Sequence, residues 1–108
     1  MMESIAADPV SRSTIAYWRG ILELTRGNPS EAVARMSSAL EMLGPEVEPG
    51  RTGWAQIDCG LGTALARAER TEEARSHLEQ ACPIFDRYSF EQPQLHQWSV
   101  DARSQLGI

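Results

Sequence analysis

The chain has 108 residues, of which 42% are hydrophobic and 23% are charged, and its net charge is −5. This length allows one modest domain with a single core rather than two domains. The acidic balance argues against a protein that binds nucleic-acid phosphates, and the absence of lysine excludes Schiff-base chemistry and a P-loop.

The first predicted helix covers residues 13–26 and carries Ile15, Trp18 and Leu22 on one apolar face. We expect this face to be the buried one, because it has the helical spacing of a core stripe. Residues 1–11 are predicted to be either a loose, disordered leader or an extension of this helix.

An internal repeat organises the rest of the chain. Residues 29–43 align without a gap with residues 71–85 at an offset of 42. The matched positions are small or apolar, as a packed helix pair requires: Gly20 with Gly62, Ala32 with Ala74, Met36 with Leu78, and Ala39 with Ala81. Each matched helix follows another predicted helix after a short turn, so we expect two antiparallel hairpins.

The prediction is one helical-repeat domain, residues 12–108. Its parts, in chain order, are repeat one (12–44), a linker (45–53), repeat two (54–86) and a final capping helix (93–106). Pro83 falls inside the fourth helix, where it removes a backbone hydrogen bond, so we expect a kink or an early end there.

The small and large residues of the second helix of each pair, such as Ala74, Leu78 and Ala81, resemble the signature of the tetratricopeptide repeat. The 42-residue period is longer than the family's usual one and resembles the repeats of kinesin light chains and bacterial regulators. The resemblance implies an all-α fold of about five helices, stacked as antiparallel hairpins in a short right-handed solenoid.

The resemblance also implies a function and a site. It implies a protein–protein interaction or scaffold module, part of a larger regulator or assembly, or a homodimer formed through an open helical face. The partner would be a protein or peptide. The chain itself would have no enzymatic activity and would bind no cofactor. The implied partner-binding groove is lined by Thr14, Tyr17, Ile21, Leu24, Gln56, Cys59, Thr63, Ala66 and Arg67. None of these is the lysine or asparagine with which chaperone-binding members clamp a C-terminal carboxylate.

An alternative interpretation is a small helical bundle that binds a small molecule or acts as an enzyme. It would need a closed cavity with convergent polar groups. The glycines of "CGLGTAL" lie inside a predicted helix, so close helix packing explains them better than a dinucleotide loop.

Metal binding is not expected, because Cys59, His77, Cys82 and His96 lack the spacing of a metal site. The two cysteines are expected to be reduced structural thiols. No apolar run is long enough to span a bilayer and the start lacks a signal peptide, so we expect a cytoplasmic protein without a membrane anchor. Among the tryptophans, Trp54 is predicted to pack in the core, whereas Trp18 and Trp98 could anchor a partner.

Overall fold

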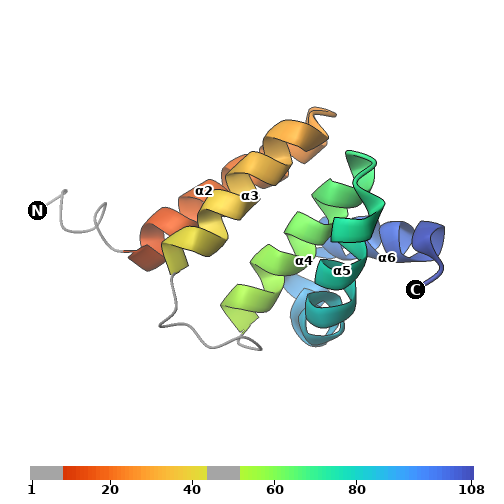
Figure 1. The fold of residues 1–108 in the computed structure, drawn as a ribbon. Coiled ribbons are helices and arrows are strands. Elements are labelled where there is room, and N and C mark those ends of the chain that lie inside the picture. The colour runs from red at the N-terminus through yellow and green to blue at the C-terminus, as the bar shows by residue number, and fades with distance from the viewer. Residues whose placement is uncertain (1–8, 44–51) are drawn as a thin grey trace, which may run out of the picture.

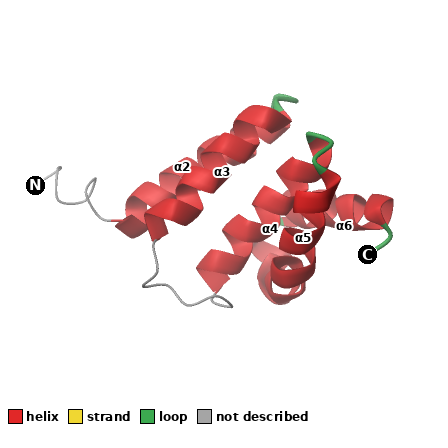
Figure 2. Ribbon diagram, viewed as in Figure 1, coloured by secondary structure: helices red, strands yellow, loops and turns green. Residues whose placement is uncertain are grey.

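A computed structural model describes residues 9–43 and 52–108, which form five α-helices and one 3-10 helix and contain no strand (Figures 1 and 2). The elements are α2 (Pro9–Thr25), α3 (Pro29–Leu43), α4 (Thr52–Arg67), α5 (Thr71–Phe85), η1 (Asp86–Glu91) and α6 (Pro93–Leu106). The predicted all-α class is confirmed for this part of the chain. The predicted leader and linker lie mostly outside the described residues, and residues 9–11 extend the first helix.

The helices form two hairpins and one final helix (Figure 1). α2 and α3 lie side by side, and Gly27 in the turn between them has a left-handed φ of 80°. α4 and α5 form the second hairpin, whose turn places Glu69 at a left-handed φ of 66°. α3 packs against α4, and α6 packs against both α4 and α5.

A glycine faces a large side chain at the centre of each hairpin. A Cβ atom on Gly20 would lie 2.6 Å from Cγ of Met36, and one on Gly62 would lie 2.9 Å from Cγ of Leu78. These pairs correspond to each other at the 42-residue offset. In both hairpins, the missing side chain lets the two helices approach closely.

The orientation of α2 differs from the expectation. Its exposed face carries Ile15, Trp18 and Leu22, which are 51%, 49% and 45% exposed, so the prediction that they point inward is wrong. The buried face instead carries Ser13, Ala16, Tyr17, Gly20 and Leu24. Gly20 determines which face of α2 is buried, because Met36 can pack closely only against the side of the helix that lacks a side chain.

Cys59 and Cys82 form a disulfide that joins α4 to α5, so the expectation of two reduced thiols is wrong for this structure. Both residues are fully buried in the core. Disulfides are rare in reducing compartments. The thiol argument therefore no longer supports a cytoplasmic location, which stays a prediction.

Pro83 does not end the fourth helix. α5 continues past it to Phe85, and the chain then tightens into the 3-10 helix η1. Proline removes one backbone donor and crowds the carbonyl four residues earlier. Phe85 is buried in the core, and this contact favours the helical conformation beyond the proline.

Replacing Gly62 with alanine tests the close contact between α4 and α5. The new Cβ would lie 3.0 Å from the backbone nitrogen of Leu78, so α5 itself would have to move. We expect overpacking to exceed the gain in helix propensity and to lower the free energy of unfolding by about 1–2 kcal/mol in urea titration. Gly53→Ala is the matched control, because a Cβ there meets nothing within 4 Å. Equal stability changes in the two variants would contradict this packing.

Reduction of the disulfide should destabilise the fold. The bridged cysteines are 23 residues apart, and closing a loop of that size stabilises by about 3 kcal/mol through the unfolded state. We expect a reductant to lower the urea midpoint of the wild type and to leave that of a Cys59→Ala, Cys82→Ala double variant unchanged. Two reactive thiols in denatured, unreduced protein would show that the bridge is absent.

Candidate partner-binding surface

The outer face of α2 carries three large apolar side chains in a row. Ile15, Trp18 and Leu22 are spaced three and four residues apart, which places them along one side of the helix. We call these three residues the α2 stripe. Single exposed apolar residues are ordinary, but three neighbouring ones on one helix face are typical of a contact surface.

A hollow of about 230 Å³ adjoins one side of the stripe, where α2 approaches the start of α6. It is lined by Trp18, Ile21, Glu91, Gln92, Pro93, Gln94 and Leu95. We call it the α2–α6 hollow. Its apolar members come from two helices that are distant in sequence, so the folded chain creates a surface that neither helix has alone.

Tyr17 contacts residues on both sides of this hollow. Its fully buried side chain lies edge-on to the ring of Trp18, and its hydroxyl donates a hydrogen bond to Oε1 of Gln92. Burial raises the pKa of the Tyr17 phenol, so the hydroxyl stays protonated and remains a donor at neutral pH. The residue therefore supports the surface from inside.

A second hollow, of about 260 Å³, lies between α2 and α3 on the other side of the stripe. Its lining is Arg12, Ile15, Ala16, Arg19, Arg35 and Met42. We call it the α2–α3 hollow. Apolar side chains and guanidinium groups from both helices line it together, so the hollow combines apolar surface with positive charge.

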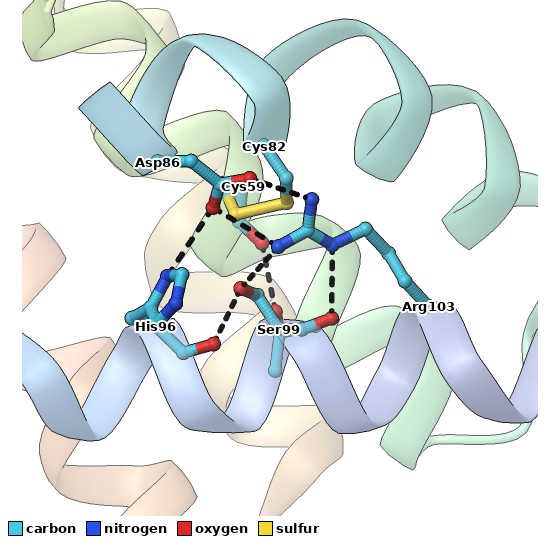
Figure 3. A network of polar contacts seen from close by, with 7 residues as sticks. Cys59, Cys82, Asp86, His96, Ser99 and Arg103 are labelled. Atoms are coloured by element: carbon cyan, nitrogen blue, oxygen red, sulfur yellow. Dashed lines mark hydrogen bonds and ion pairs between the residues drawn. A yellow bond between two sulfur atoms is a disulfide. The ribbon is translucent and has the colours of Figure 1, made fainter. Parts of the chain in front are cut away.

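A polar network fixes α6 beside the disulfide (Figure 3). The guanidinium of Arg103 donates to both carboxylate oxygens of Asp86 at 2.9 and 3.0 Å, and its Nε donates to the carbonyl of Ser99 at 3.2 Å. Nδ1 of His96 lies 3.2 Å from Asp86 Oδ1 but is not aligned for a hydrogen bond.

This network does not have the arrangement of a catalytic triad. The buried hydroxyl of Ser99 donates to the carbonyl of His96 at 2.8 Å, within its own helix, rather than to an imidazole. Arg103 already engages both oxygens of Asp86. The arrangement is that of a structural clamp between α6 and the end of α5.

A second histidine pairs with a buried carboxylate. Nδ1 of His77 on α5 lies 2.6 Å from Oδ1 of Asp58 on α4, whose side chain is almost fully buried. The hydrogen bond to Asp58 is the main cause that raises the pKa of His77, and burial opposes it. No group of three or more potential metal ligands occurs within the described ranges.

The residues of the predicted groove separate into two groups. Tyr17, Leu24, Cys59 and Thr63 lie in the core and present no side chain to a partner. Thr14 and Arg67 are exposed, and Ile21, Gln56 and Ala66 are partly exposed. Only Ile21 lines a hollow described above, while Arg67 stacks over the ring of Trp98 at 4.8 Å.

The sequence interpretation named Trp18 as a possible partner anchor, but it missed the rest of the exposed stripe and the arginines of the α2–α3 hollow. A signal for the arginines was present. Arg12 and Arg19 lie two helical turns apart on either side of Ile15, and Arg19 and Arg35 are equally far from the turn at Gly27. An antiparallel hairpin therefore brings Arg19 and Arg35 to the same level.

Comparison with family models, with curated proteins and with solved structures finds no match to this chain. None of the described helices has both the length and the apolar character needed to cross a membrane.

The His77–Asp58 pair should make stability depend on pH. Because the folded-state pKa of His77 is raised, its contribution is fully present below about pH 6.5 and is lost as pH rises through the folded-state pKa. We expect a decrease in the free energy of unfolding of at most about 1 kcal/mol, since His77 is one-third exposed. Urea titrations over a pH series would measure it. His77→Gln and Asp58→Asn should both abolish the decrease, and its persistence in His77→Gln would refute the assignment.

Proposed function

We propose that this chain is a protein-interaction module of the tetratricopeptide type, a short right-handed stack of helix hairpins that binds a protein partner through the α2 stripe. The observation that carries the proposal is the exposure of Ile15, Trp18 and Leu22, each about half accessible, on one face of α2. A few side chains supply most of the binding energy in protein interfaces, and tryptophan is enriched among them.

The repeated contact supports the repeat class. Gly20 meets Met36 and Gly62 meets Leu78 in equivalent positions of the two hairpins. Proteins built from such hairpins stack each unit against the next, and a terminal unit keeps one face without a neighbour. No element within residues 9–43 and 52–108 covers the outer face of the first hairpin, which supports a partner contact there.

A helix is the partner element that this surface suits best. The stripe extends over two helical turns and is bordered by a hollow on each side. A helix with apolar residues on one face can lie along such a stripe, as in other helix-in-groove complexes. A second copy of the chain could supply that helix, in which case the module is a homodimer.

Substitution of the stripe tests the proposal. Leu22→Gln should remove one apolar contact while leaving the fold intact, because Leu22 is 45% exposed and lies outside the core. We expect at least a tenfold loss of affinity, about 1.4 kcal/mol, for any protein that binds the purified chain directly. Calorimetry with a partner identified by cross-linking, or sedimentation in the case of self-association, would measure it.

Val100→Gln is the matched control, since Val100 is also an exposed apolar residue, on α6 and away from the stripe. It should change affinity less than twofold, roughly the error of such a titration. A direct partner whose affinity is unchanged by Leu22→Gln and lowered by Val100→Gln would place the interface on α6 and overturn the proposal.

A further inference from the structure

Four arginines in the described residues make no ion pair, hydrogen bond or ring contact, and three of them gather in one place. Arg12, Arg19 and Arg35 line the α2–α3 hollow, and the fourth, Arg87, lies in η1. The other described arginines all have such a partner: Arg26, Arg67, Arg70, Arg75 and Arg103. In a chain with a net charge of −5, three arginines without an ion-pair partner therefore gather at one hollow.

The three guanidinium groups surround an apolar floor. Arg12 and Arg19 are seven residues apart on α2, so they lie about 10 Å apart along the helix axis. Arg35 on α3 lies at the level of Arg19, because both are equally far from the turn. Ile15 lies between Arg12 and Arg19 on α2 and also belongs to the stripe, and Met42 on α3 is as far from the turn as Arg12.

We infer that the α2–α3 hollow and the stripe together take an acidic amphipathic helix of a partner protein, which deepens the proposed function and rests on it. The apolar face of that helix lies on Ile15, Met42 and the stripe. Its carboxylates, about two turns apart, pair with Arg12 at one end and with Arg19 and Arg35 at the other. Arginine suits this role because its planar guanidinium binds a carboxylate through two hydrogen bonds.

The shape of the surface favours a helix over a small anion. A small anion would engage the charges and leave the apolar floor uncovered. A helix spanning the distance from Arg12 to Arg19 covers both and continues onto Leu22.

A second copy of this chain is a poorer occupant. Its most acidic helix is α5, on which Glu72, Glu73 and Glu79 are exposed. The exposed residues beside these glutamates are Arg75, Ser76 and Gln80, which are charged or polar and would not fill the apolar floor.

Three designed helical peptides of about 20 residues test the inference. They share one apolar face and differ only in the flanking residues, which are glutamate, glutamine or lysine. Fluorescence anisotropy would measure their affinity for the intact chain at about 0.05 M and about 0.5 M salt. We expect the glutamate peptide to bind at least about tenfold more tightly than the glutamine peptide at low salt, with a smaller ratio at high salt. The lysine peptide should bind most weakly.

Single arginine substitutions locate the interaction. Arg19→Gln and Arg35→Gln should each lower the affinity for the glutamate peptide about three- to tenfold and leave the affinity for the glutamine peptide unchanged. Arg87→Gln is the matched control, because it removes the same charge from an arginine outside the hollow. It should have less than about a twofold effect.

The outcomes separate this inference from the proposed function. Equal binding of the glutamate and glutamine peptides, both weakened by Leu22→Gln, would keep the stripe as an interface and overturn the acidic partner. Equal effects of Arg87→Gln and Arg19→Gln would overturn the hollow as the source of the preference. Absence of binding by all three peptides, or self-association that the glutamate peptide does not disrupt, would also overturn the inference. The proposed function would then depend only on the Leu22→Gln test with a natural partner or a second copy.

Discussion

The arrangement of the helices depends on the contact of Met36 with two glycines. A Cβ atom on Gly20 of α2 would lie 2.6 Å from Cγ of Met36, and one on Gly60 of α4 would lie 3.0 Å from its Sδ. One side chain of α3 thus occupies space left by the two neighbouring helices. This contact fixes the spacing inside the first hairpin and also the stacking of that hairpin on α4.

The glycine pair of α4 extends the same constraint to the second hairpin. Gly60 and Gly62 are two residues apart, which corresponds to about 200° around a helix, so they face opposite neighbours. Gly60 faces Met36, whereas Gly62 faces Leu78 of α5. α4 is therefore enclosed on several sides, and most of its residues from Ala55 to Leu65 are buried. α2 differs from α4 in this respect, because the described helices cover only one of its faces.

The sequence predicted the helices and their pairing well, but not the rotation of α2. The 42-residue offset aligned Gly20 with Gly62 and Met36 with Leu78, and in the structure Gly20 lies against Met36 and Gly62 against Leu78. α2, however, has two apolar faces. One carries Ile15, Trp18 and Leu22, and the other carries Tyr17 and Leu24. The helical period alone does not determine which of the two faces is buried. The same rotation explains why Tyr17 and Leu24 of the predicted groove lie in the core.

Two other features depend on contacts between helices, so no short stretch of the sequence predicts them. The disulfide requires α4 and α5 to bring Cys59 and Cys82 together, and a separation of 23 residues does not predict this. The α2–α3 hollow requires arginines from two antiparallel helices at the same level. Hairpin geometry could have indicated that level once Gly27 was identified as the turn, because Arg19 and Arg35 are equally far from it.

The rotation of α2 separates what folds the chain from what remains available for binding. Gly20, Tyr17 and Leu24 supply the contacts of this helix with the core, so Ile15, Trp18 and Leu22 are not needed to fix its position. An apolar stripe that folding leaves exposed would favour nonspecific association in water. Arg12 and Arg19 lie beside Ile15 on the same face and place charge next to it, which keeps the surface hydrated and penalises partners without complementary charge. On the proposed function, affinity would come from the stripe and selectivity from the arginines beside it, and these side chains can be substituted separately without altering the contacts that hold the fold.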